Sequence, residues 1–307
     1  MRKFFMLFIG VISLAACNRS PEYYFKRANI SVSRGKEMQA IQDYNKAILL
    51  KRNFPEALTA RGMIYEHMGD KQKAEQDYKH AINSSKDYIP AYNNLAALLM
   101  DQGNFREAAD YLDEALKVNR DYPYAILNRG LCNYKLGRFK AAKADLTRAL
   151  KMNPKFDMAY YHRALISKHE GNIKAAMEDL VKAIDNNPSA VLAWHELGKM
   201  LYSQKEYANA AQNFKKADDL AGNDMKAETS FWLALSTYQI GYYEQALESA
   251  LLADELKPGS YKTNGLIGDI YAKTGDINNA GDYYKKAGEL AGNKAGFYRA
   301  RLAAIGR

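Results

Sequence analysis

The feature that most constrains this 307-residue chain is a sequence repeat of 34 residues. Glycine recurs at this interval, and two alanines follow each glycine position, seven residues apart. A fixed period of about 20 to 50 residues indicates identical supersecondary units that stack on one continuous core. The glycines are Gly35, Gly69, Gly103, Gly137, Gly171, Gly241 and Gly275, and the two alanine series run from Ala40 to Ala280 and from Ala47 to Ala287.

Small residues, turn residues and prolines divide each unit into two helices. Helices approach closely only where small residues lie at the crossing, which the alanines provide on the second helix. An equally small series is expected to face them from the first helix: Ala28, Gly62, Ala96, Gly130, Ala164, Gly198, Ala234 and Gly268. The glycine between the helices supplies the left-handed residue that ends the first helix. All seven prolines fall at repeat boundaries, so none interrupts a helix.

This pattern resembles the tetratricopeptide repeat, a 34-residue pair of antiparallel helices, from Pro21 to Lys294. The resemblance implies an all-α, right-handed superhelical solenoid of about eight helix-turn-helix units over residues 21–294. In the sixth repeat Lys205 replaces the turn glycine, and the register then slips by two residues near 222–226, where we expect a flexible joint. Residues 295–307 leave the pattern and are expected to form a C-terminal capping helix.

The amino terminus has the features of an export signal. Arg2 and Lys3 precede an apolar run of thirteen residues, whereas a spanning helix needs about 20. The segment Leu14-Ala15-Ala16-Cys17 resembles the lipobox of bacterial lipoproteins. This resemblance implies a signal peptide over residues 1–16, a diacylglycerol and an N-acyl chain, typically palmitate, on Cys17, and a short lipidated tether over residues 17–20. Asn18 resembles the enterobacterial pattern for the outer membrane, so we expect an anchor there that faces the periplasm.

The charge balance bears on the class of partner. Lys and Arg number 44 against 35 Asp and Glu, a net charge of +9, and removal of residues 1–16 leaves +7. Such a moderate excess suits acidic proteins, anionic lipids or nucleic acid. An exported chain does not meet the genome, so we expect no nucleic-acid partner.

The sequence offers no motif for catalysis. It has no glycine-rich phosphate loop, no nucleophile elbow and no HExxH pair, and the repeats use almost the whole chain. We therefore expect no enzyme, no cofactor and no metal. His162, His169 and His195 are interpreted as surface or groove side chains, and Cys132 as a small core residue.

The resemblance also implies a binding surface, the concave face lined by the first helix of each repeat. At the family's exposed positions the first three repeats contribute acidic residues: Glu22, Glu56, Glu66 and Asp101. Repeats four to seven contribute aromatic and basic residues, which suit an extended peptide or a carbohydrate chain. These candidate partner-binding residues are Tyr124, Tyr134, Lys135, Tyr161, His162, Lys168, His195, Lys199, Tyr202, Phe231 and Tyr238.

From these features we expect a membrane-anchored, non-enzymatic adaptor that binds a protein partner in its groove. Similar lipoproteins help to assemble a pilus or secretion pore, a cell-wall hydrolase complex or a polysaccharide export machinery. The alternative is direct binding of polysaccharide or peptidoglycan by the aromatic groove. A homo-oligomer is left open.

Overall fold

The computed structural model describes residues 19–306, and within them every regular element is a helix. The expected signal peptide and Cys17 lie outside the described residues. The chain divides into two compact units, one ending at Leu136 and the other beginning at Gly137, and each is described by itself. The all-α array of helical hairpins is confirmed. None of the helices in the described part is long and apolar enough to cross a membrane.

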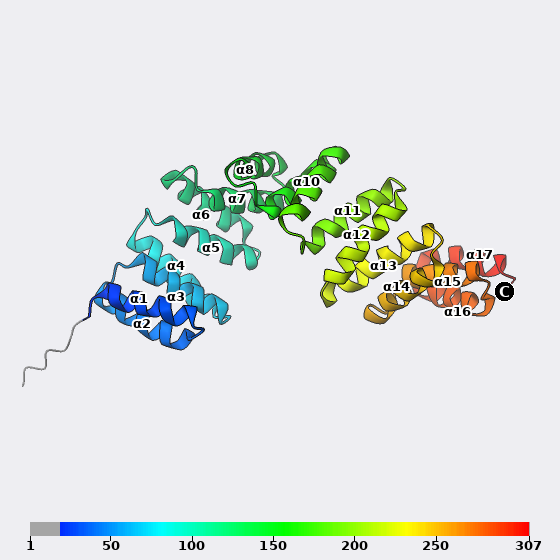
Figure 1. Cartoon of the computed structure of the whole chain (residues 1–307), viewed down its shortest axis with the longest axis horizontal. Coiled ribbons are helices and arrows are strands. Elements are labelled where there is room, and N and C mark those ends of the chain that lie inside the picture. Colours follow the sequence, from blue (N-terminus) through cyan, green and yellow to red (C-terminus); the bar gives the residue numbers. More distant parts are fainter. Residues whose placement is uncertain (1–18, 307) are drawn as a thin grey trace, which may run out of the picture. The chain divides into compact units, whose positions relative to one another are not determined.

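Unit 1 contains three helical hairpins followed by a seventh helix (Figure 1). The hairpins are α1 (Pro21–Ser33) with α2 (Glu37–Leu50), α3 (Pro55–His67) with α4 (Lys71–Ser84), and α5 (Ile89–Asp101) with α6 (Phe105–Val118); α7 (Pro123–Lys135) ends the unit. A proline stands in the first two positions of α1, α3, α5 and α7. There its missing N–H costs no hydrogen bond, so each proline marks the start of a repeat.

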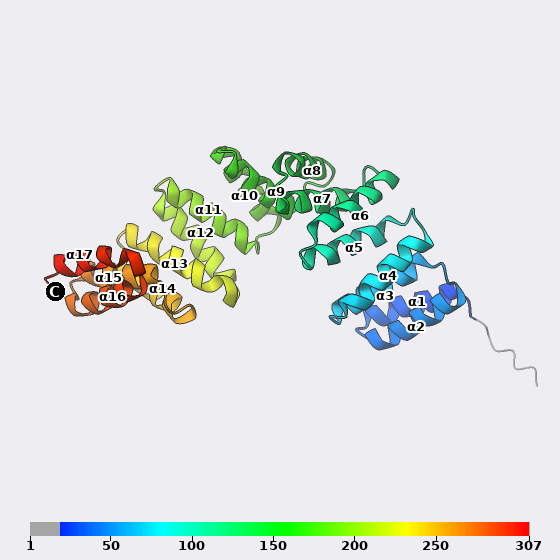
Figure 2. The ribbon, with the colours of Figure 1, turned by 180° about the vertical axis from the view of Figure 1, so that it is seen from behind.

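Unit 2 begins with α8 (Phe139–Met152) and continues with four hairpins, seen from both sides in Figure 1 and Figure 2. They are α9 (Asp157–His169) with α10 (Ile173–Asn186), α11 (Val191–Ser203) with α12 (Tyr207–Leu220), α13 (Asn223–Gln239) with α14 (Tyr243–Leu256), and α15 (Tyr261–Thr274) with α16 (Ile277–Leu290). The last helix, α17 (Ala295–Ala304), packs against α16 and buries Tyr298, as expected of a capping helix.

The turns between paired helices have the expected left-handed backbone. The seven repeat glycines have φ between 69° and 86°. In the sixth repeat Lys205 takes the same conformation, with φ of 64°, and it is the one non-glycine residue of positive φ in the described chain. This conformation costs a residue with a Cβ about 1–2 kcal/mol. The packing of the repeat therefore holds Lys205 in a left-handed conformation that a residue with a Cβ normally avoids.

Side-chain caps support some of these turns. Asp70, Asn172 and Asp276 each accept a hydrogen bond from the N–H three residues on, at 3.1 to 3.3 Å. Asn104, at the same position before α6, makes no such bond. The glycine backbone is thus the constant part of the turn, and the cap varies.

Small residues of the first helices cluster with buried alanines of the second helices, as Ala28 does with Ala40 and Ala234 with Ala246, and the glycines of this series also approach aromatic rings. A Cβ at Gly62 would lie 2.7 Å from the ring of Tyr78, and one at Gly198 would lie 2.8 Å from the ring of Phe214. The close approach therefore joins the backbone of a first helix to an aromatic side chain of its partner. A methyl group there would overpack the hairpin.

The two-residue register slip is absorbed by α13, which has 17 residues against 13 in α11. A hydrogen-bonded cluster lies beside it, centred on the buried carboxylate of Asp218. Ser230 Oγ and Thr229 Oγ1 donate to this carboxylate at 2.6 and 3.1 Å, and Lys226 Nζ lies 3.0 Å from it. The flexible joint near 222–226 stays a prediction.

Candidate functional site

Three first helices of unit 2 bring several predicted residues together. Lys168 lies on α9, and His195, Lys199 and Tyr202 lie on α11. Two residues outside the predicted set, Glu196 and Trp232, join them. We call Lys168, His195, Glu196, Lys199, Tyr202 and Trp232 the α11 cluster.

Two lysines of the cluster share one carboxylate. Lys168 Nζ donates to Glu196 Oε2 at 2.7 Å, and Lys199 Nζ donates to Oε1 at 3.1 Å. Burial alone would raise the pKa of Glu196, but the two ammonium groups outweigh it and lower the pKa below its ordinary value. Both lysines share this one carboxylate, and their side chains remain 30–40% exposed, so each ammonium group keeps donors that face solvent. The pair can therefore attract a further anionic group.

His195 is buried, in contrast to the exposed position expected from the sequence, and His162 is buried as well. Burial lowers the pKa of His195, although the nearby Glu228 carboxylate opposes this effect. Nε2 of His195 lies 3.2 Å from a carboxylate oxygen of Glu228, while the buried Nδ1 has no hydrogen-bond partner within the described chain. The imidazole is thus a buried part of the cluster, with Nε2 turned toward Glu228.

Trp232 connects the cluster to the core. Its ring stacks on Phe214 with centroids 5.7 Å apart, and the ring of Tyr202 meets it edge-on at 5.5 Å. Phe214 is fully buried and fills the space above Gly198. Lys199 Nζ lies 6.0 Å from the centre of the Trp232 ring. The aromatic part of the cluster is therefore fixed before any partner arrives, which lowers the entropy cost of binding.

The other predicted residues lie elsewhere. Tyr161 contacts His162 edge-on within α9, and Phe231 packs into the core around Ala234. Tyr238 lines a separate hollow of about 350 Å³, together with Tyr284 and Arg301. The remaining predicted residues, Tyr124, Tyr134 and Lys135, lie on α7 in unit 1.

Sequence reasoning missed Glu196 and Trp232 although a signal for both exists. Trp232 is two residues before Ala234, and Glu196 is two residues before Gly198, so both occupy the same half-buried position of successive repeats. Because the register slips, this spacing is 36 residues rather than 34. When the repeats are aligned on Gly198 and Ala234 of the small-residue series, Glu196 and Trp232 fall at the same position.

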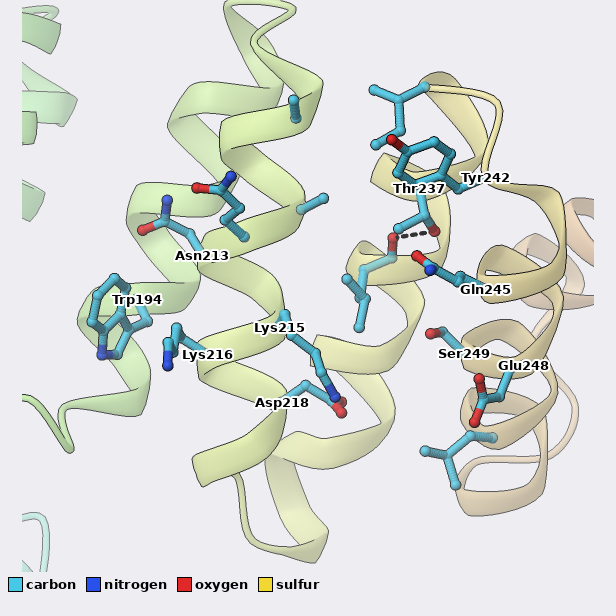
Figure 3. A pocket seen from close by; sticks show the side chains of 16 residues that line it. Trp194, Asn213, Lys215, Lys216, Asp218, Thr237, Tyr242, Gln245, Glu248 and Ser249 are labelled. Atoms are coloured by element: carbon cyan, nitrogen blue, oxygen red, sulfur yellow. Dashed lines mark hydrogen bonds between the residues drawn. The ribbon is translucent and has the colours of Figure 1, made fainter.

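A second hollow is lined by residues of α11 to α14 and lies between α12 and α14 (Figure 3). It has a volume of about 940 Å³. Thr237 and Leu233 of α13 form part of its lining, Lys215 and Asp218 come from α12, and Gln245 comes from α14. We call it the α12–α14 cleft.

The cleft lies where other repeats insert an arginine between neighbouring second helices. Arg163 lies on α9. It donates to Asp179 on the paired helix α10 at 2.7 and 2.8 Å and to Thr147 on α8 of the preceding repeat at 3.3 Å. Arg61 bridges Asp77 and Asn45 in the same way. Leu233 and Ser249 stand at the corresponding positions of the seventh repeat. The missing guanidinium and carboxylate help to open the cleft.

The buried cysteine carries no reactive chemistry. Cys132 is a free thiol with no exposed surface, as expected of a core residue, and burial raises its pKa to about 12. The thiolate that would act as nucleophile or ligand is therefore absent near neutral pH. Within residues 19–306 no group of three or more His, Cys, Asp or Glu side chains is placed to hold a metal ion.

Comparison with known proteins identifies the repeats. Tetratricopeptide repeat family models match residues 21–54, 55–88 and 93–142, and a tetratricopeptide repeat-like domain model matches residues 156–307. Among curated proteins, a DnaJ homolog subfamily C member 7 homolog of Schizosaccharomyces pombe is 34% identical over 90 residues, 29% of this chain. The match spans only 19% of that relative's length.

Solved structures show the same fold. PilF of Pseudomonas aeruginosa superposes with a TM-score of 0.63 at 19% identity, covering 71% of this chain and 97% of its own. A tetratricopeptide repeat protein of Parabacteroides merdae superposes with a TM-score of 0.58 at 18% identity, covering 81% of this chain and 98% of its own. At these identities the likeness concerns the fold alone.

Proposed function

Since the chain is an array of tetratricopeptide repeats, we propose that it is a membrane-anchored, non-enzymatic adaptor whose α11 cluster binds an extended segment of a protein partner. Repeat proteins of this kind generally act as scaffolds for protein interactions. The partner would belong to an assembly of the bacterial envelope, such as a pilus or secretion pore, a cell-wall hydrolase complex or a polysaccharide export machinery.

The single observation that carries this proposal is the pairing of a cationic and an aromatic element on adjacent first helices. Lys168 and Lys199 are held by Glu196 and retain donors for an incoming carboxylate. Tyr202 and Trp232 form a rigid apolar surface beside them. Large aromatic side chains next to basic groups are typical of residues that dominate binding energy at protein interfaces.

The geometry favours a peptide over a sugar at this position. Sugars stack on open ring faces, but Phe214 stacks on Trp232 and Lys199 lies over the same ring. The ring edges and the ammonium groups remain to contact an extended chain. Peptide carboxylates and apolar side chains match these two features.

Anchoring through Cys17 completes the proposal. A lipid on Cys17 would hold the array at the outer membrane, facing the periplasm, through acyl chains that each add about 0.8 kcal/mol per buried CH₂. The arrangement would leave both units in the aqueous space, where a partner can reach the α11 cluster.

A matched pair of variants tests the binding site. Tyr202→Ala with Trp232→Ala should weaken the affinity for an envelope partner at least about thirtyfold, because central aromatic anchors contribute about 2 kcal/mol or more. Trp194→Ala with Tyr242→Ala removes the same two residue types from the lining of the α12–α14 cleft and should leave the affinity unchanged. The partner is identified by capture from solubilised envelopes, and its dissociation constant is then measured with each variant.

Circular dichroism shows whether both variants keep their helices. If the folded cleft variant loses the partner and the α11 variant keeps it, the binding site is the cleft. Strong binding of peptidoglycan fragments or glycans by the wild type, lost in the α11 variant, would replace the protein partner by a polysaccharide.

A further inference from the structure

The positive charge of the protein is concentrated in its first repeat. Residues 19–54 contain eight Lys and Arg against three Asp and Glu, a net charge of +5. The remaining 253 residues, 55–307, contain 34 basic and 32 acidic residues, a net charge of +2. The excess noted for the whole chain is therefore mainly a property of α1, α2 and their flanking residues.

The outer face of α1 is uncovered at positions that later repeats bury. Ile30 is 50% exposed, whereas the residues at its position in the second to sixth repeats, Ile64, Leu98, Cys132, Ile166 and Met200, are at most 5% exposed. Tyr23 is likewise 37% exposed, while its counterparts Ala57 and Ala91 are fully buried. In Figure 1, α1 and α2 form the first hairpin of unit 1, and among the described residues no repeat lies before α1.

Basic side chains surround this apolar strip. Tyr23, Lys26 and Ile30 follow one another at the three- and four-residue spacing of a single face of α1, and Arg34 is the residue that caps its C-terminus. Lys26 and Arg34 are exposed, and Lys26 also interacts electrostatically with the nearby carboxylate of Glu22. Arg19 lies over the ring of Tyr23, 4.3 Å from its centre. An apolar strip flanked by exposed basic groups is the composition of a helix that lies on an anionic membrane surface.

The proposed anchor would place this face next to a bilayer. Cys17 precedes Pro21, the first residue of α1, by four positions. At about 3.5 Å per extended residue, the tether can separate them by no more than about 14 Å. The potential of an anionic surface extends for a Debye length of about 8–10 Å at physiological ionic strength. The tether is therefore short enough for α1 to lie along the surface, where its basic groups come within this range.

We propose that the outer face of α1, formed by Tyr23, Lys26, Ile30 and Arg34, docks on anionic phospholipid headgroups and fixes the array on the membrane. This inference extends the membrane anchoring of the proposed function, with the lipid on Cys17 as the first attachment and the face of α1 as the second. It orients unit 1 with α1 toward the bilayer and α3 to α7 away from it.

The test uses the chain from Asn18 onward, which contains every described residue and carries no lipid. It should sediment with vesicles that contain phosphatidylglycerol but much less with pure phosphatidylcholine vesicles, and high salt should release it. Lys26→Glu with Arg34→Glu should weaken this binding at least about tenfold, because each basic residue near the surface contributes about 1 kcal/mol. Lys174→Glu with Lys216→Glu makes the same charge change at exposed positions of unit 2 and should have less than about a twofold effect.

Ile30→Asn keeps the charge and should weaken binding severalfold at every salt concentration, because it removes the apolar part of the face. The proposal would be overturned if the unit 1 and unit 2 charge variants lost vesicle binding equally. It would also be overturned if the wild type bound vesicles with and without phosphatidylglycerol equally well. A dimer in solution that Ile30→Asn converts to a monomer, without any effect on vesicle binding, would assign the face to a second copy of the chain. None of these results depends on whether Cys17 is lipidated.

Discussion

Replacing Arg163 by leucine should lower the free energy of unfolding of its repeat by about 3 kcal/mol. Arg163 makes a two-pronged ion pair with Asp179, whose side chain is only 8% exposed. Removing one partner of a buried pair leaves an uncompensated charge, which costs about 3–5 kcal/mol, and the partly exposed guanidinium places the effect at the low end. Urea unfolding followed by circular dichroism, with hydrogen exchange in α9 and α10, measures the loss.

The chain provides its own control for this variant. The sixth repeat has Leu197 and Asn213 at the positions of Arg163 and Asp179. Arg163→Leu with Asp179→Asn copies that repeat and should recover about 1–2 kcal/mol of the loss, because no buried charge remains. A double variant no more stable than Arg163→Leu would mean that the ion pair does not explain the stability of the hairpin.

In high salt, Cys17→Ala should release the protein from the membrane fraction. The expected lipid is the only covalent attachment in the proposal, and several acyl chains bind a bilayer far more strongly than the α1 face alone. Fractionation of cells in high salt, which suppresses the electrostatic contribution of α1, gives the clearest comparison with the wild type. Mass spectrometry of the wild-type amino terminus reports the acyl chains directly.

Two outcomes would contradict the anchoring proposal. A Cys17→Ala protein that remains wholly in membranes after the high-salt wash would require another anchor. A wild-type mature protein that lacks acyl chains would show that the segment before Cys17 is an ordinary cleavage site.

Much of the fold could be predicted from the sequence because the repeat encodes it locally. Turn glycines, prolines at helix starts and buried alanines each have one physical role, and Lys205 could be placed in a left-handed turn from its register alone. What the glycines contact could not be predicted, because Gly62 and Gly198 meet a ring from the paired helix. The side-chain partner depends on three-dimensional packing rather than on spacing.

The candidate site was only partly predictable for a related reason. Lys168, Lys199 and Tyr202 were found because exposed positions recur with the repeat. The two-residue slip before Trp232 hid its alignment with Glu196, and the burial of His195 follows from contact with Phe214 on another helix. Periodicity therefore predicts which helices carry a surface, whereas the register slip and the packing decide which side chains compose it.

Site-specific photo-crosslinking in cells tests the central claim, that the α11 cluster is where a protein partner binds. A photoreactive amino acid at Glu228, an exposed residue whose carboxylate lies 3.2 Å from His195, reports on the α11 cluster, and one at Gln212 reports on the α12–α14 cleft. We expect a crosslink to a single envelope protein from position 228, lost in the Tyr202→Ala and Trp232→Ala variant, and none from position 212. A crosslink to that protein from position 212 alone, or crosslinks from position 228 that survive the two substitutions, would contradict the claim.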